Sequence, residues 1–118
     1  MSDHDTIVAA QKQMQEAVLE LEELANDVAK AKTVKEFSVD QRKVMLATCV
    51  KFYLDAGEGL GAAEHKARAS DAFAEALGKR MAEYQVACET IEAAEALKLK
   101  FASAQSILSA EKAKIGLI

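Results

Sequence analysis

The side chains that most often carry out chemistry are few in this chain of 118 residues, and they lie far apart along it. Its histidines are His4 and His65, and its cysteines are Cys49 and Cys88. A zinc site needs Cys or His ligands at short, regular spacing, and these four residues never reach it. Each cysteine falls on the apolar face of an expected helix, where a thiol packs as a small apolar group. We therefore expect no metal site, no cofactor, and two reduced, buried thiols rather than a disulfide.

The acidic and hydroxyl side chains also lack the arrangements that catalysis requires. Glu22 and Glu23 are neighbours on a polar helix face, whereas a catalytic pair of carboxylates must be held close together in a buried site. A helical di-metal carboxylate site needs Glu three residues before His, and neither histidine has one there. No serine stands in the sequence of a nucleophile elbow. We therefore expect a protein that is not an enzyme.

Gly57, Gly59 and Gly61 form the glycine cluster of the chain. A phosphate-binding loop would need a strand before the cluster and a Lys-Ser or Lys-Thr pair after it, and the sequence provides neither. The alternative is a helix stop with glycine at the C′ position, followed by a turn. We favour the helix stop, and the sequence leaves open whether the turn is fixed or acts as a hinge.

The composition predicts that helices position all of these side chains. The chain has no Pro, no Trp and five Gly, while 51% of its residues are hydrophobic and its net charge is only −4. Proline and glycine are the residues that interrupt helices, and a chain this apolar is not typical of disorder. We predict one all-α domain over residues 1–118, built as a long antiparallel helical hairpin or small helical bundle with coiled-coil character.

A heptad pattern predicts the first helix over residues 5–32, with Ser2, Asp3 or Asp5 as its cap. Apolar residues recur every seven positions in one row, and small or apolar residues follow three positions later in a second row. The first row is Ile7, Met14, Leu21 and Val28, and the second is Ala10, Ala17, Leu24 and Ala31. Because alanine is frequent in this seam, the partner helix must approach closely.

A short connection over residues 33–37 should separate the first helix from a second one over residues 39–56. Ser38 and Gln41 have the spacing of a capping box at the start of that helix. Nine of its residues between 44 and 54 are apolar. Because such a helix is normally covered on several sides, we expect it at the centre of the core, or covered by a second subunit if one chain does not cover it. A shorter helix over residues 62–69 follows.

The last predicted helix spans residues 71–114, with Ser70 or Asp71 as its cap. We expect the residues of its apolar stripe, like those of the first helix, to lie in the seam between helices or at a contact between subunits. That stripe contains Phe73, Leu77, Met81, Tyr84, Ile91, Phe101 and Leu108. The spacing of the stripe tightens near residues 93–96, which predicts a bend or a change of packing partner. Because this helix is longer than the others, its uncovered stripe predicts a homodimer.

Basic residues suggest an alternative role in binding nucleic acid. One cluster consists of Lys66, Arg68, Lys79 and Arg80, and a second contains Lys98 and Lys100. Such residues would contact phosphates in a salt-dependent way, without reading bases. The competing interpretation is a solvated helix surface with pairs four residues apart, such as Glu75 with Lys79.

The segment from Ala69 to Leu77, ASDAFAEAL, follows the basic residues Lys66 and Arg68. In this it resembles small helical, coiled-coil phage proteins, in which a basic helix end precedes an Ala-Ser pair and an aromatic residue. The similarity covers residues 64–118, although Asp71 stands where Pro or Glu is usual. Those proteins are described as of unknown function and are often encoded near replication and recombination genes. The resemblance implies a long C-terminal helix and carries over no catalytic residues.

These observations together predict a non-enzymatic helical module that binds another protein as a scaffold, adaptor or inhibitor. We expect it to self-associate, and the alternative is an accessory nucleic-acid-binding protein in phage replication or recombination. No apolar stretch reaches the roughly 20 residues that span a bilayer, and the first residues are acidic where a secretory signal is basic. We therefore expect no membrane partner and a cytoplasmic location, in the host if a phage encodes the chain.

Overall fold

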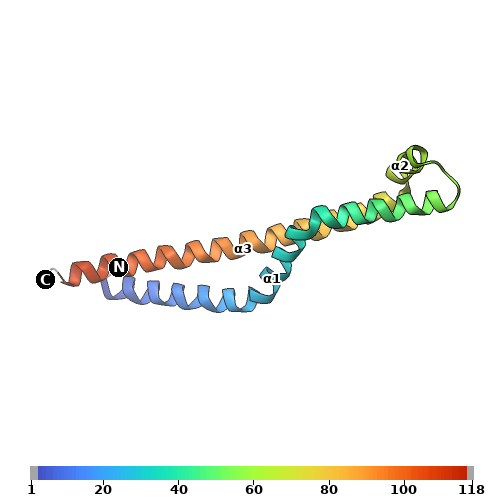
Figure 1. Cartoon of the computed structure of the whole chain (residues 1–118). Helices are drawn as coiled ribbons and strands as arrows, with labels where there is room; N and C mark the ends of the chain where they lie inside the picture. Colours follow the sequence, from blue (N-terminus) through green and yellow to red (C-terminus); the bar gives the residue numbers. More distant parts are fainter. Residues whose placement is uncertain (1–2, 117–118) are drawn as a thin grey trace. The chain divides into compact units, whose positions relative to one another are not determined.

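A computed structural model describes residues 3–116, which form three helices and no strand (Figure 1). The helices are α1 (Asp3–Asp55), α2 (Leu60–Ala69) and α3 (Asp71–Gly116). The predicted all-α class is therefore confirmed. The predicted helices over residues 62–69 and 71–114 correspond to α2 and α3, with ends that differ by two residues at most.

The predicted break between residues 5–32 and 39–56 is wrong, because α1 runs through it without interruption. Residues 33–37 contain no Gly or Pro, and each β-branched residue there costs a helix only about 0.5–0.7 kcal/mol relative to Ala. Ser38 does not cap a new helix. Its hydroxyl instead donates a hydrogen bond to the Lys35 carbonyl, at 3.1 Å. Bonding to the preceding turn is how serine is accommodated inside a helix.

The end of α1 confirms the prediction of a helix stop with glycine at C′. Gly57 has a φ of +96°, in the left-handed region that favours glycine. Its N–H donates to the Leu54 carbonyl at 3.0 Å, and the Glu58 N–H donates to the Tyr53 carbonyl at 3.1 Å. These two bonds form a Schellman motif. Glu58 also pairs with Lys66, which ties the turn to α2.

Ser70 joins α2 to α3 and confirms the predicted cap of the last helix. Its Oγ accepts a hydrogen bond from the Phe73 N–H at 3.1 Å. The same hydroxyl donates to the Ala67 carbonyl at 2.7 Å, and the Ser70 N–H donates to that carbonyl at 3.2 Å. One residue therefore ends one helix and begins the next. Of the caps proposed for α1, Ser2 lies outside the described residues, whereas Asp3 and Asp5 lie in the first turn.

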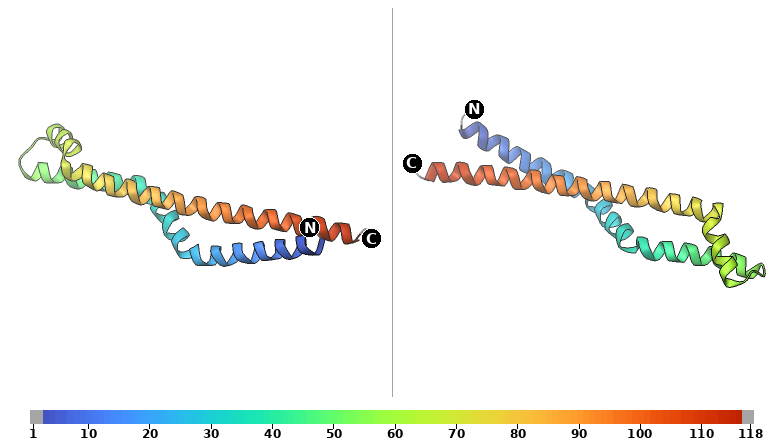
Figure 2. Two further views of the ribbon diagram at one scale, coloured as in Figure 1. Left: turned by 180° about the vertical axis from the view of Figure 1, so that it is seen from behind. Right: turned by 90° about the horizontal axis from the view of Figure 1, so that it is seen from above.

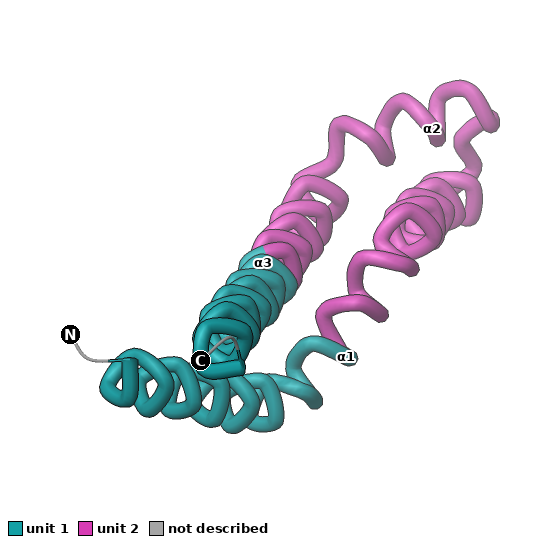
Figure 3. Tube along the Cα trace, turned by 90° about the vertical axis from the view of Figure 1, so that its left-hand side faces the viewer, with its two compact units in different colours: residues 1–29, 89–118 teal, residues 30–88 magenta. Residues whose placement is uncertain are grey.

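The chain folds into two compact units, each built from segments of more than one helix (Figure 3). Unit 1 combines residues 1–29 with residues 89–118, and unit 2 contains residues 30–88. Helices α1 and α3 each contribute to both units. The single domain expected over residues 1–118 stays a prediction. The division into units does not contradict it, since the same two helices run through both units.

In unit 1, the first part of α1 lies antiparallel beside the last part of α3 (Figures 1 and 2). Gln13 Nε2 donates to the Lys100 carbonyl at 3.0 Å, and Lys100 Nζ lies 3.9 Å from Glu16 Oε2. The buried residues of this unit are Ala10, Ala17, Ala94, Ala104 and Glu111. Alanine at the contact lets two helices pack at the short end of the usual 8–10 Å spacing.

The seam on α3 follows heptads more regularly than its sequence suggests. From residue 87 onward, buried and half-buried positions form two rows that are three residues apart. The rows are Ala87, Ala94, Phe101, Leu108 and Thr90, Leu97, Ala104, Glu111. The bend or change of packing partner expected near residues 93–96 is not found, because the seam keeps its spacing there and the boundary between the units lies earlier, between Cys88 and Glu89. Taking Ile91 instead of Thr90 as the seam residue made the spacing look irregular.

In unit 2, α2 crosses from the end of α1 to the start of α3 (Figure 3). Its buried residues are Ala31, Ala63, Ala67 and Ala87. The expectation that residues 44–54 form the centre of the core is wrong, because Val44 is 64% exposed and Phe52 is 69% exposed. The ten-residue α2 covers only one face of this segment. Among the described residues, no large side chain is fully buried.

Candidate protein-interaction site

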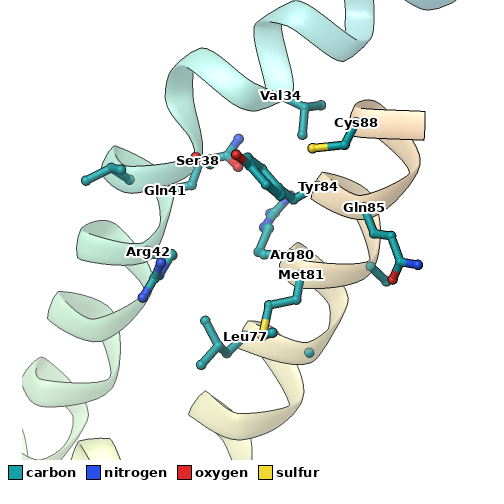
Figure 4. Close-up of a pocket in the computed structure, with 13 residues that line it drawn as sticks. Val34, Ser38, Gln41, Arg42, Leu77, Arg80, Met81, Tyr84, Gln85 and Cys88 are labelled. Carbon is teal, nitrogen blue, oxygen red and sulfur yellow. The ribbon is translucent and has the colours of Figure 1, made fainter. Parts of the chain in front are cut away.

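Three of the large apolar side chains that unit 2 leaves exposed, Val39, Met81 and Tyr84, line a groove between its two long helical segments. The groove has a volume of about 970 Å³ and lies between residues 34–42 of α1 and residues 77–88 of α3 (Figure 4). We call it the unit 2 groove. Its apolar lining consists of Val34, Val39, Leu77, Met81, Tyr84 and Cys88.

Much of this lining is open to solvent. Val39 is 57% exposed, Met81 63% and Tyr84 40%. Fully burying an apolar side chain of this size is worth about 1.5–3 kcal/mol. Covering this groove would therefore add a favourable free energy of burial that the chain by itself does not gain.

The ends of the unit explain why the groove stays open. Ala31 and Ala87 are buried next to the lining residues Val34 and Cys88, which indicates that α1 and α3 approach closely there. At the other end, α2 stands between the two helices, with Ala63 fully buried (Figure 3). Two helices held apart at one end cannot close along their whole length. The space between them is therefore lined by side chains that no part of unit 2 covers.

The charged residues that line the groove are both arginines, Arg42 and Arg80 (Figure 4). Arg80 Nη1 lies 3.0 Å from Glu83 Oε2, an exposed pair that is worth about 0–1 kcal/mol. Arg42 forms no ion pair with any residue in the described part of the chain. Because no carboxylate contributes to the lining, the groove combines an apolar surface with positive charge.

The residues predicted to lie in a seam or at a subunit contact fall into two sets. Ile7, Met14, Leu21, Val28, Ile91, Phe101 and Leu108 are half-buried and belong to unit 1. Phe73 and Leu77 are half-buried in unit 2, whereas Met81 and Tyr84 are exposed there. The first set packs within the chain, so a charge at Leu21 or Ile91 would disturb unit 1 itself. The exposed pair is the part of the prediction that remains free to contact a partner.

Known proteins offer no guide to this site. No protein-family model matches the chain, and no curated protein and no solved structure matches it either. The resemblance to helical phage proteins stays a prediction.

Four of the six residues predicted to contact phosphates are paired with carboxylates. Lys66 pairs with Glu58, Arg80 with Glu83, Lys98 with Glu95 at 3.4 Å, and Lys100 with Glu16. Among the described residues, Arg68 and Lys79 form no ion pair, and the expected pair of Lys79 with Glu75 is not present. Local pairing lowers the positive potential that phosphate contacts would need.

The remaining chemistry-bearing residues stay dispersed. Cys49 and Cys88 are free thiols and half-buried, not buried as expected. Within residues 3–116, no group of three or more His, Cys, Asp or Glu side chains is close enough to hold a metal ion. In the same range, no helix contains a stretch long and apolar enough to cross a bilayer.

Sequence reasoning identified one wall of the groove and missed the other. Met81 and Tyr84 belong to the predicted stripe of the last helix. Val39 and Arg42 were not singled out, because the predicted break at residues 33–37 interrupted the register of α1. Continuing the first heptad rows beyond Val28 and Ala31 gives Lys35, Ser38 and Arg42, so Arg42 could have been placed on the side of the seam. Val39 lies outside both rows, and no sequence signal marked it.

Proposed function

We propose that this protein is a non-enzymatic helical interaction module that binds another protein and associates with itself. It would act as a scaffold, adaptor or inhibitor, in the cytoplasm and in a phage context. The observation that carries the proposal is the combination of an alanine core with an uncovered apolar groove. Because no large side chain is fully buried among residues 3–116, covering the groove with a partner would add stability.

Nucleic-acid binding is the second candidate, supported by the unpaired basic residues Arg68 and Lys79 of unit 2. Protein binding is favoured over it because four of the six predicted phosphate contacts are already paired. The unit 2 groove also offers more apolar than charged surface, which suits a protein partner better than a phosphate backbone.

The two candidates are distinguished by affinity capture of the tagged protein from a host lysate, with and without nuclease. We expect a protein that remains bound after nuclease treatment, together with a mass in light scattering above the 12.7 kDa of one chain. A bound set that disappears with nuclease would favour the nucleic-acid alternative. A monomeric mass and no captured protein would contradict the proposed function.

A further inference from the structure

We propose that the unit 2 groove of one copy receives the first part of α1, residues 3–29, of a second copy. This inference rests on the proposed self-association and names its two contact surfaces. One surface is the arginine-containing groove, and the other is the acidic outer face of α1 in unit 1. The charges of the two surfaces and the apolar residues within them carry the argument.

The charge of the groove argues against two grooves facing each other. A symmetric contact of that kind would place Arg42 and Arg80 of one copy against the same arginines of the other. Like charges brought together at a desolvated contact cost several kcal/mol. Glu83 offsets part of the charge of Arg80, but Arg42 has no ion pair among the described residues, so a surface that carries negative charge suits the groove better than a second groove does.

Residues 3–29 provide that charge. They contain seven Asp and Glu residues but only one basic residue, Lys12. Within the described part of the chain, Glu20, Glu22, Glu23 and Asp27 form no ion pair. Unit 2, in contrast, has ten Lys and Arg against eight Asp and Glu. The two units of the chain are thus opposite in charge.

The outer face of the same helical segment also carries apolar residues that the chain does not cover. Val8 is 48% exposed and Leu19 59% exposed. They are eleven residues apart, which is three helical turns, so they lie on the same face. Glu22 and Glu23 follow Leu19 by three and four residues, which places them one turn further along this face. The face therefore offers apolar side chains followed by carboxylates.

This face complements the unit 2 groove in both respects. Leu19 would contact the apolar lining around Met81 and Tyr84, and Glu22 and Glu23, one turn further along, would lie near the two arginines. Val8 lies about 16 Å from Leu19 along the helix and would point to the other end of the groove, toward Cys88. The volume of about 970 Å³ is at the upper end of the range of small-ligand pockets and accepts several side chains of a helix. Laying an amphipathic helix into an apolar groove is a common mode of peptide recognition.

Charge reversal on each surface tests the proposal by light scattering and sedimentation of the full chain. Arg42→Glu with Arg80→Glu reverses the groove, and Glu22→Arg with Glu23→Arg reverses the helix. Each double variant should weaken self-association at least about tenfold, because like charges then meet. A 1:1 mixture of the two variants should associate again, since every contact between different variants joins opposite charges.

A matched control makes the same change of charge elsewhere in unit 2. Lys43→Glu with Lys51→Glu alters residues that line a separate groove of about 340 Å³, and it should leave self-association within twofold of the unsubstituted chain. Circular dichroism should show unchanged helix content in all variants.

Three results would overturn the proposal. They are a monomeric unsubstituted chain at every concentration, unchanged or stronger association after reversal of either surface, and a mixture that fails to associate. The proposed function is contradicted only if the chain is monomeric and also captures no protein from the lysate.

Discussion

At the scale of single residues, alanine determines how the helices of unit 1 pack. Ala17 and Ala104 are completely buried, whereas the larger seam residues around them remain partly accessible. A small side chain at the contact brings the two backbones together, and the longer side chains then lie along the sides of the interface. The stability of this unit therefore depends on keeping these positions small.

Enlarging one of these alanines should destabilise the unit. We expect Ala17→Leu to lower the free energy of unfolding by about 1–3 kcal/mol, because the added atoms force the helices apart. Ala25→Leu is the matched control, since Ala25 is exposed on the same helix and should change stability by less than about 0.5 kcal/mol. Urea unfolding followed by circular dichroism measures both. Equal effects of the two substitutions would contradict close packing at Ala17.

Glu111 is the exception to the alanine core. It is 8% exposed, and its Oε1 lies 3.3 Å from Lys114 Nζ. Its Oε2 is buried and has no hydrogen-bond partner among residues 3–116. A buried carboxylate oxygen without a partner lowers stability, so this residue weakens the end of the seam rather than strengthening it.

At the scale of the elements, the ends of the helices depend on two residues. Gly57 ends α1 through its left-handed backbone, and Ser70 both ends α2 and caps α3. Together they fix where α2 begins and ends. They therefore maintain the separation between α1 and α3 that opens the unit 2 groove.

Gly57→Ala should destabilise the protein by about 1–2 kcal/mol, because a Cβ is disfavoured in the left-handed region. Space is not the cause, since no atom lies within 4 Å of the Cβ position. Gly61→Ala is the control: it has the same free space but no positive φ, and it should raise stability by about 0.5–1 kcal/mol. Thermal unfolding of both variants gives the comparison. A stabilising Gly57→Ala would show that the Schellman turn is not maintained in solution.

At the scale of the whole molecule, folding and association should be coupled. Each chain has an alanine core and an open apolar groove, so covering the groove in an assembly adds the burial that the single chain lacks. Binding that favours the folded state raises its stability according to the concentration of the partner. A second copy would act in this way as a stabilising ligand.

The midpoint of thermal unfolding should therefore rise with protein concentration. We expect an increase of several degrees between about 1 and 100 µM, because the folded copies associate and the unfolded chains do not. The variant with Arg42→Glu and Arg80→Glu should lose most of this dependence. Circular dichroism in cells of different path length measures it. A midpoint that is independent of concentration would show that association contributes nothing to stability.

The sequence by itself determined that the chain is helical and, to within two residues, where α2 and α3 begin and end. Helix propensity, the glycine at position 57 and the serine at position 70 act over a few residues, so they can be recognised without knowing the fold. The seam of unit 1 could also be predicted from the sequence, because the heptad rows that begin at Ile7 and Ala10 repeat at fixed intervals. The all-α class follows from the same local preferences.

Only the tertiary structure decided that α1 continues through residues 33–37 and that Val44 and Phe52 stay exposed. A few tenths of a kcal/mol separate helix from connection at Thr33 and Val34, and packing over the whole helix outweighs such differences. The unit 2 groove depends on α2 standing between segments that are about forty residues apart in sequence. Because no local pattern encodes the distance between two such segments, Val39 and Arg42 gained their place in a candidate site only from the fold.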